Sequence, residues 1–201
     1  MPFDHNDHYH RLLLRRIPPG ALTALDVGCG TGRFARRLAA RGLRVDAIDA
    51  SPEAVTAAGT APGITFRVAD VTRVELPKGH YDVITCLASL HHVPFSTVTA
   101  LRAALAPGGV LLVLGCHPER TPADWAVSLT AVPVNAAARL AVAAADRLRG
   151  RSPEAVRAPV RPPTTPLPQI RAESAHLLPG SRLRRLLFWR YLLVFRNDTG
   201  G

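Results

Sequence analysis

The sequence predicts a doubly wound α/β protein built on a mostly parallel β-sheet. Short apolar runs alternate with segments of helical periodicity along residues 21–116. This alternation is typical of βαβ units, which place helices on both faces of a parallel sheet. In addition, a turn with glycine at every second position, Gly28, Gly30 and Gly32, follows the first apolar run and precedes a helix. Such a turn lets a ligand approach the backbone at the start of the helix.

The individual elements follow from periodicity and turn signals. Strands are expected where short runs rich in Val, Ile, Leu and Ala are bounded by turn residues, at 21–27, 43–49, 63–68, 81–87 and 110–115. Helices are expected where apolar residues recur at helical spacing, at 31–41, after Ser51, at 96–105 and at 169–177. Ser51 is the expected N-cap, with Pro52 at the first helical position. One or two closing strands are expected within 181–196.

The domain organisation is one main unit with two additions. Pro18-Pro19-Gly20 ends a helical N-terminal segment, so residues 1–20 are expected to form a separate helical unit and residues 21–201 the main domain. The strand–helix alternation stops after residue 116, and residues 117–168 are expected to form an insertion. The insertion combines an Ala-rich helical region at about 122–148 with a loop rich in Pro and Arg, which suggests a cover over a site or a flexible connection.

The composition limits the classes of partner. The net charge is +10, and all the basic residues except Lys78 are arginines. Because the charge is scattered and lacks interleaved aromatic residues, nucleic-acid binding is disfavoured. Three widely spaced cysteines predict a reducing compartment rather than a disulfide framework. The polar N-terminus resembles no signal peptide, and no run suffices to span a membrane, so a cytoplasmic location is expected.

The glycine turn discriminates between two cofactor classes. A dinucleotide fingerprint would need a third glycine at position 33, where this sequence has Arg33. An acidic residue, Asp26, stands directly before the turn. A nearby carboxylate would repel the negative charge of a pyrophosphate, whereas a cationic sulfonium ligand with an amino-acid tail tolerates such a carboxylate. The spacing therefore favours the sulfonium class over a nicotinamide-dependent oxidoreductase.

The motif LDVGCGTG at 25–32 resembles the first motif of class I S-adenosylmethionine (SAM)-dependent methyltransferases. The resemblance continues through YDVITCLASLHHV at 81–93 and LAPGGVLLV at 105–113, and it covers residues 20–116 most strongly. It implies a seven-stranded sheet of order 3-2-1-4-5, then 7 and 6, in which the seventh strand is antiparallel. The order of the first five strands also agrees with general topology rules. SAM is the implied cofactor, with S-adenosylhomocysteine as its product.

The resemblance also implies a set of cofactor-binding residues. Asp49 would accept hydrogen bonds from the ribose hydroxyls, although it could instead cap the following helix. Asp70 would accept from the adenine amine, although it could be a turn residue, and Val71 would give the base an apolar face. The backbone of Leu87 is expected near the methionine amino group. Residues 1–20 would form a helical lid over the cofactor, with Tyr9 near the methionine carboxylate or the acceptor, although this segment could instead be a solvated helix start. The remaining members of the set are Asp26, Gly28, Cys29, Gly30 and Ala50.

His92 and His91 are the candidate catalytic residues because they follow the fourth strand, where the acceptor would meet the methyl donor. Neutral histidine suits a general base near pH 7. The alternatives are a structural role for both rings and catalysis by proximity alone. His5, His8 and His10 have a spacing that invites a metal site, but no cysteine or carboxylate cluster accompanies them, and no metal is expected.

The predicted function is methyl transfer from SAM to an O or N atom of a small molecule. A tetrapeptide of the Asn/Asp-Pro-Pro-Tyr/Phe type after the fourth strand is absent. Its absence disfavours nucleobase amines and glutamine as methyl acceptors, without excluding other RNA or peptide acceptors. A non-catalytic SAM-binding relative is the other alternative. The oligomeric state is left open. The three cysteines, Cys29, Cys86 and Cys116, are expected to be small packing residues at strand ends rather than nucleophiles.

Overall fold

The computed structural model describes residues 5–118, 162–187 and 189–198. These residues form a seven-stranded sheet of order β3-β2-β1-β4-β5-β7-β6, which confirms the predicted fold class and strand order. The first five strands are mutually parallel, whereas β7 runs antiparallel to both β5 and β6. The strands are β1 Thr23–Val27, β2 Arg44–Asp49, β3 Ile64–Val68, β4 Tyr81–Leu87, β5 Leu105–Cys116, β6 Arg182–Arg185 and β7 Arg190–Arg196.

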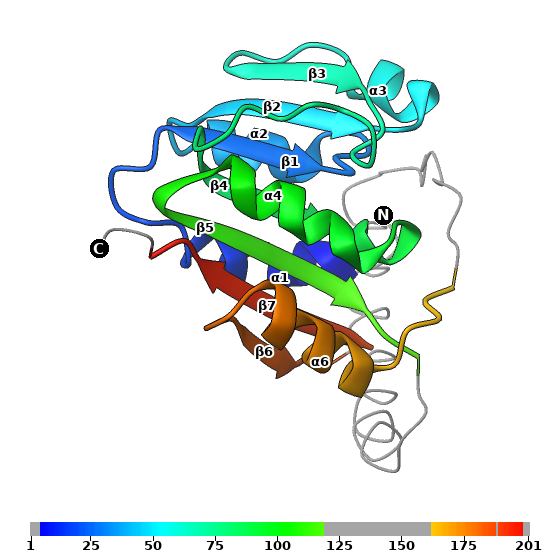
Figure 1. The fold of residues 1–201 in the computed structure, drawn as a ribbon. Helices are drawn as coiled ribbons and strands as arrows, with labels where there is room; N and C mark the ends of the chain where they lie inside the picture. The colour runs from blue at the N-terminus through cyan, green and yellow to red at the C-terminus, as the bar shows by residue number, and fades with distance from the viewer. Residues whose placement is uncertain (1–4, 119–161, 188, 199–201) are drawn as a thin grey trace.

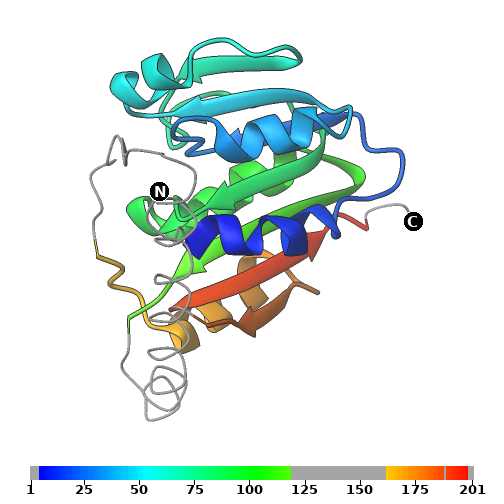
Figure 2. The ribbon, with the colours of Figure 1, turned by 180° about the vertical axis from the view of Figure 1, so that it is seen from behind.

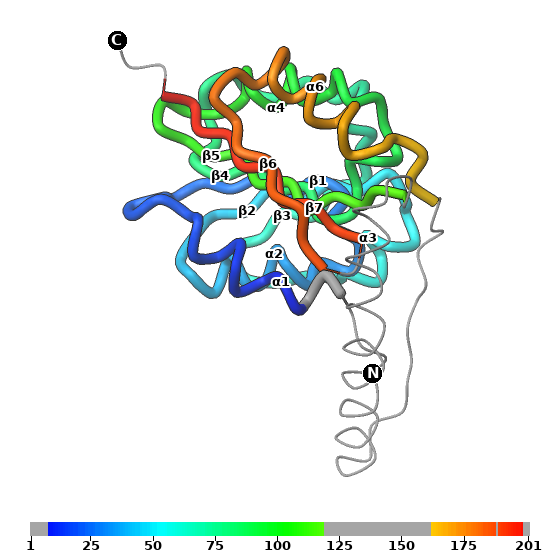
Figure 3. Tube along the Cα trace, turned by 90° about the horizontal axis from the view of Figure 1, so that it is seen from below, coloured from blue at the N-terminus to red at the C-terminus, as the bar shows by residue number. Residues whose placement is uncertain are grey.

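Helices cover both faces of the sheet, as Figures 1, 2 and 3 show together. The helices α4 and α6 lie on one face, and α1 and α2 lie on the other. Two short 3-10 turns, η1 and η2, connect β4 to α4. The bounds are α1 His5–Leu14, α2 Arg33–Ala39, α3 Pro52–Ala58, η1 Leu90–His92, η2 Phe95–Thr97, α4 Val98–Ala104 and α6 Leu167–Leu177.

Each face of the sheet has its own hydrophobic core, because successive residues of a buried strand point to opposite faces. Leu13 of α1 and Leu38 of α2 pack in one cluster with Leu112 of β5. Leu101 of α4 packs in the other cluster with Leu111 of β5, the neighbour of Leu112 in the chain. Strands buried on both faces require continuous apolar runs, and this requirement explains why β1, β4 and β5 were recognisable in the sequence, whereas the edge strand β3 is only partly buried.

The fifth strand is longer than the sequence suggested. Its predicted start was residue 110, but β5 begins at Leu105 and includes the Pro107-Gly108-Gly109 turn signal. The register shifts between Tyr81 and Val83 of β4, which pair with Leu105 and Val110 of β5. A Cβ on Gly109 would lie 2.9 Å from the carbonyl oxygen of Tyr81, so only glycine lets the chain pass this irregularity.

Several local predictions are confirmed. Ser51 is the N-cap of α3: its side chain accepts a hydrogen bond from the Ala54 amide at 3.1 Å, and Pro52 opens the helix. The helix expected at 169–177 is α6, and two closing strands follow it. The predicted helical region at about 122–148 and most of the 117–168 insertion lie outside the described residues. Within the described parts of the chain, no helix is long and apolar enough to cross a membrane.

Candidate functional site

The candidate site lies at the carboxyl ends of β1, β2, β3 and β4. The strand β1 pairs with β2 on one side and with β4 on the other. The chain therefore winds outward in opposite directions from β1, and this reversal opens a crevice in doubly wound sheets. The turn after β1, the end of β2 and the segment after β4 all meet at this point.

The glycine turn is held by backbone hydrogen bonds to the neighbouring strand. The amides of Gly28 and Cys29 both donate to the carbonyl oxygen of Ile48, at 2.8 and 3.0 Å. Gly28, Gly30 and Gly32 all have positive φ, which favours glycine. A Cβ on Gly28 would lie 2.3 Å from the Ser89 Cβ, whereas a Cβ on Gly30 would meet nothing within 4 Å. The turn is thus tightly packed at Gly28 and open at Gly30.

Asp49 occupies the end of β2, directly beside the open part of the turn. Its Oδ2 accepts a hydrogen bond from the Gly30 amide at 2.8 Å, and its Oδ1 accepts one from the Ser51 amide at 2.9 Å. The helix cap is Ser51 rather than Asp49. Each carboxylate oxygen can accept more than one hydrogen bond, so Asp49 is a fixed acceptor with remaining capacity. Ala50, next in the chain, is exposed.

Asp26 lies beneath the glycine turn and is 2% exposed. The Thr85 hydroxyl of β4 donates a hydrogen bond to Asp26 Oδ1 at 2.7 Å. Burial raises the pKa of Asp26 to about 6, against the hydrogen bonds from Thr85 and the Ala35 backbone, which lower it. The negative charge of Asp49 adds to the increase. The two carboxylates therefore interact, and Asp26 supports the turn from below.

Asp70 follows β3 and is placed near Asp49 through the backbone, because the Ala69 amide donates to the Asp49 carbonyl at 2.9 Å. The Asp70 side chain is exposed, and its Oδ1 accepts from both the amide and the hydroxyl of Thr72. These hydrogen bonds lower the pKa of Asp70. The carboxylate thus has a turn-forming role, and its adenine contact stays a prediction. Val71 is half-buried against the second core cluster.

The three cysteines are free thiols and all are buried. Burial raises the pKa of Cys29 to about 12, and the charges of Asp26 and Asp49 contribute. Burial also raises the pKa of Cys86 and of Cys116. Because the thiolate is the nucleophilic form, these residues are suited to packing rather than to attack.

The segment after β4 carries the candidate catalytic histidines. Leu87 ends the strand, and Ala88 has a φ of 52°, a strained conformation for a residue with a Cβ. The Ser89 hydroxyl then donates to the Val27 carbonyl oxygen at 2.7 Å, which fixes the segment against the end of β1. The rings of His91 and His92 are neighbours, with centroids 4.0 Å apart, and His92 is the more exposed.

Tyr9 of α1 reaches the carboxyl end of the sheet from the side of β7. It is buried, and its hydroxyl donates to the Leu187 carbonyl oxygen at 3.0 Å. Leu187 belongs to the turn between β6 and β7, and β7 begins at Arg190 opposite Cys116, the end of β5. The helix α1 is also part of the core through Leu13. A lid role for residues 1–20 and a cofactor contact for Tyr9 stay predictions.

Two residues of this region were missed by sequence reasoning. Arg36 donates to the Thr31 carbonyl oxygen at 2.7 Å and to the Ala58 carbonyl oxygen, so it ties the glycine turn to the end of α3. Its guanidinium also lies 5.5 Å from the ring centroid of Phe66 on β3. Ser89 is the second such residue. An arginine on a helix and a serine after a strand have no distinctive motif, so only the structure identifies their contacts.

No metal-binding cluster occurs among the described side chains. The structure brings together no group of three or more His, Cys, Asp or Glu residues that could hold a metal ion in that part of the chain. The side chain of His5 lies outside the described residues. His10 is buried and packs against Phe34, with ring centroids 4.8 Å apart. His10 is thus involved in packing, whereas His8 is exposed.

Comparison with known proteins identifies the family. A family model described as a methyltransferase domain matches residues 24–109, which include the glycine turn, Asp49 and the histidine pair. An uncharacterized methyltransferase of Mycobacterium tuberculosis is 34% identical over 204 residues, which cover 97% of this chain and 97% of the relative. This chain therefore belongs to the class I SAM-dependent methyltransferases.

Two further comparisons have a narrower scope. A ubiquinone biosynthesis O-methyltransferase of Xanthomonas axonopodis pv. citri is 35% identical over 122 residues, which cover 57% of this chain and 50% of the relative. The crystal structure of a SAM-dependent methyltransferase from Mesorhizobium loti matches with a TM-score of 0.61 and 18% identity, over 95% of this chain and 99% of that one. The second likeness concerns the fold alone.

Proposed function

We propose that the protein transfers the methyl group of SAM to an O or N atom of a small molecule. The observation that carries the proposal is the fixed carboxylate of Asp49 beside the open face of Gly30. A ligand that lies on the turn at Gly30 would therefore be next to the Asp49 carboxylate, which can accept hydrogen bonds from two neighbouring hydroxyl groups. This combination fits a nucleoside whose ribose faces Asp49.

The residues around the turn fit the rest of SAM. Gly28, Cys29 and Gly30 would line the cofactor with their backbone, and Ala50 would flank its ribose. Asp70 and Val71 follow β3, the strand next to β2, and this is the position expected for an adenine-binding segment. Leu87 would place backbone polar groups near the methionine part, and Tyr9 would lie close to the methionine carboxylate or the acceptor. When bound, SAM supplies an electrophilic methyl group on a positively charged sulfur.

The buried carboxylate Asp26 supports this fit electrostatically. A cationic ligand above the turn would be stabilised by the Asp26 and Asp49 charges, whereas a pyrophosphate on the turn would be repelled by the Asp26 charge directly before it. The same argument disfavours a nicotinamide dinucleotide.

In this proposal the acceptor approaches from the segment after β4. His92 would accept the proton that the acceptor O or N loses, with His91 beside it. The half-buried His91 ring limits the positions that the His92 ring can take. The strained Ala88 and the Ser89 hydrogen bond fix the backbone that carries both rings. Alignment and exclusion of water would supply the rest of the rate enhancement.

The choice of a small-molecule acceptor has support from one relative. The Xanthomonas relative is an O-methyltransferase of ubiquinone biosynthesis by name, and the similarity covers 57% of this chain and 50% of that relative. It therefore supports the cofactor more than the acceptor. An oxygen acceptor on a small molecule is the first class to screen.

The decisive experiment is calorimetric titration of the protein with S-adenosylhomocysteine, with NADH as the control ligand. Micromolar binding of S-adenosylhomocysteine alone is expected. Asp49→Ala should weaken binding at least about tenfold, because charge-assisted hydrogen bonds to the ribose are lost. Glu173→Ala, which removes a carboxylate from α6 on the other side of the sheet, should leave the affinity unchanged.

The acceptor is then identified by transfer of a labelled methyl group from SAM. His92→Gln should lower kcat and remove the acidic limb of its pH profile if His92 is the base, while S-adenosylhomocysteine still binds. Binding without transfer to any small molecule, RNA or peptide would indicate a non-catalytic relative. Binding of NADH in place of S-adenosylhomocysteine would contradict the proposal.

A further inference from the structure

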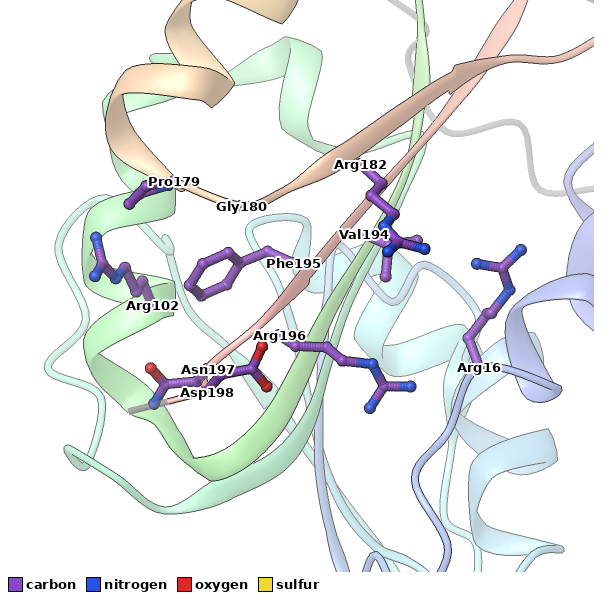
Figure 4. A pocket seen from close by; sticks show the side chains of 10 residues that line it. All are labelled: Arg16, Arg102, Pro179, Gly180, Arg182, Val194, Phe195, Arg196, Asn197 and Asp198. Atoms are coloured by element: carbon purple, nitrogen blue, oxygen red, sulfur yellow. The ribbon is translucent and has the colours of Figure 1, made fainter. Parts of the chain in front are cut away.

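A second candidate binding site lies at the opposite end of the strands from the glycine turn. A pocket of about 440 Å³ opens where α1, α4, β6 and β7 meet (Figure 4). Val110 of β5 pairs with Arg196, and Cys116 pairs with Arg190. The two ends of β7 are therefore roughly 20 Å apart, at about 3.3 Å per residue. The pocket is at the Arg196 end and is separate from the candidate SAM site.

The wall of the pocket is strongly basic. Its lining includes four arginines, Arg16, Arg102, Arg182 and Arg196, and one acidic residue, Asp198, so the formal charge of the lining is +3. Three of these arginines come from separate elements and share one face of the sheet. Arg182 pairs with Val194, and Arg196 is two residues further along β7. Residues at these positions point to the same face.

The shared face is the one that α1 covers, because Val194 belongs to the same core cluster as Leu13. Arg16 follows α1 in the chain, and its side chain lines the pocket beside those of Arg182 and Arg196 (Figure 4). Arg102 of α4 lines the pocket from the other face of the sheet, because Phe195, the residue beneath it, belongs to the second core cluster. It lies over the Phe195 ring, 5.4 Å from the centroid, and donates to the Leu177 carbonyl oxygen at 3.3 Å. The pocket thus combines one anchored guanidinium with Arg182 and Arg196, which are exposed, and Arg16, which is half-buried.

We propose that this pocket binds a phosphate group. Guanidinium groups gathered in a concave site repel one another and focus a positive potential, and a bound anion relieves this repulsion. The planar arrangement of donors on arginine matches phosphate oxygens, often with two hydrogen bonds per side chain. A doubly charged phosphate offsets the +3 lining better than a single carboxylate does. The volume also admits part of the molecule that carries the phosphate.

The phosphate could belong to a soluble molecule or to the headgroup of an anionic lipid. Both sources present the same chemistry to the arginines, and they differ in what surrounds the group. The probe for the soluble source is pyrophosphate, titrated by calorimetry in phosphate-free buffer at low salt. The probe for the lipid source is a vesicle of phosphatidylglycerol and phosphatidylcholine, compared with pure phosphatidylcholine in a sedimentation assay.

The matched variants are Arg182→Gln/Arg196→Gln and Arg37→Gln. The double variant should weaken pyrophosphate or vesicle binding at least about tenfold, because charged hydrogen bonds to phosphate are lost. Arg37 is exposed on α2 and does not line the pocket, so Arg37→Gln should bind as the unaltered protein does. Thermal melting without ligand verifies folding. The double variant should melt no lower than the unaltered protein, since repulsion between arginines is removed.

The outcomes separate the possibilities. Binding of pyrophosphate supports a soluble phosphorylated ligand, and binding of anionic vesicles alone supports a lipid headgroup. Absence of both, or an equal loss in the double variant and in Arg37→Gln, overturns the proposal. Binding of single-stranded RNA that pyrophosphate does not displace also overturns it, in favour of a nucleic-acid surface. The S-adenosylhomocysteine affinity should be the same in all three proteins, so failure here is distinct from failure of the proposed function.

Discussion

The hydroxyl of Thr85 donates a hydrogen bond to the carboxylate of Asp26, and both side chains are buried between β1 and β4. This pair lies under the glycine turn, with Asp49 on the other side of the turn. The hydrogen bond offsets only part of the desolvation of the carboxylate, because the pKa of Asp26 is still raised to about 6.

The first prediction is that Asp26 makes the protein less stable as the pH rises from about 4 to 6. Its ordinary pKa is 3.8 and its folded pKa is about 6. Between these values the folded state binds more protons than the unfolded state, so the free energy of unfolding falls with rising pH. The full decrease is about 3 kcal/mol above pH 6, at about 1.4 kcal/mol per pKa unit.

Urea unfolding of the unaltered protein and of Asp26→Asn tests this directly. From pH 4.5 to pH 7.5, the free energy of unfolding of the unaltered protein should fall relative to that of Asp26→Asn. Thr85→Val, which removes the hydrogen bond, should destabilise the protein more at pH 7.5 than at pH 4.5. Parallel pH curves for the unaltered protein and Asp26→Asn would show that Asp26 does not titrate in this range.

The second prediction concerns the Tyr9 hydroxyl. Tyr9→Phe removes its hydrogen bond to the Leu187 carbonyl oxygen, which should cost about 1 kcal/mol and lower the melting temperature by about 2–4 °C. The matched variant is Tyr81→Phe, which removes the hydrogen bond from the first residue of β4 to Asp46 of β2. If Tyr9 also contacts the methionine carboxylate, only Tyr9→Phe should weaken S-adenosylhomocysteine binding. Equal affinities in both variants would limit Tyr9 to a structural role.

How far the sequence predicted this structure depends on the range of the interactions involved. The parallel strands and the Ser51 cap were predictable because buried runs and capping residues act locally. The start of β5 was not, because Leu105 joins the sheet only through its pairing with Tyr81 across a register shift. The closing strands were recognisable from their composition, whereas their order came from the family resemblance.

The candidate site shows the same division. The glycine turn and Asp49 stood out because a positive φ and a carboxylate after a strand leave a local pattern. Arg36 did not, since it acts on Thr31 and Ala58 through contacts that no spacing encodes. Likewise, the arginines of the second pocket are far apart in the sequence. Only the antiparallel pairing of β6 with β7 and the packing of α1 on the sheet bring them to the same pocket.

The third prediction is that the thiols react slowly in the folded protein. Raising the pKa of Cys29 from 9.0 to about 12 lowers its thiolate fraction, and hence its reaction rate, roughly 1000-fold at neutral pH, before burial slows access further. A chromogenic disulfide reagent should therefore label little of the folded protein within minutes and all three cysteines in denaturant. Rapid labelling of Cys29, identified by mass spectrometry, would contradict its burial beneath the turn.

The fourth prediction separates Gly30, which has open space beside it, from the tightly packed Gly28. Gly30→Ala places a methyl group in open space, so its main structural penalty is the positive φ, about 1 kcal/mol. Gly42 also has a positive φ with open space around it, and it lies in the turn before β2, away from the carboxyl ends. Gly30→Ala and Gly42→Ala should thus lose similar stability, measured by urea unfolding. Gly28→Ala should lose several times more, because its methyl group would collide with Ser89.

Ligand binding should divide these variants differently. The methyl group of Gly30→Ala occupies the surface on which the cofactor is proposed to lie, so S-adenosylhomocysteine affinity should fall at least about tenfold, as expected when a ligand must shift to avoid a clash. Gly42→Ala should bind with the affinity of the unaltered protein. If both variants bind equally well, the open face at Gly30 is not the cofactor surface. In that case only the titration of Asp49→Ala would locate the ribose, and the cofactor would lie further toward β3.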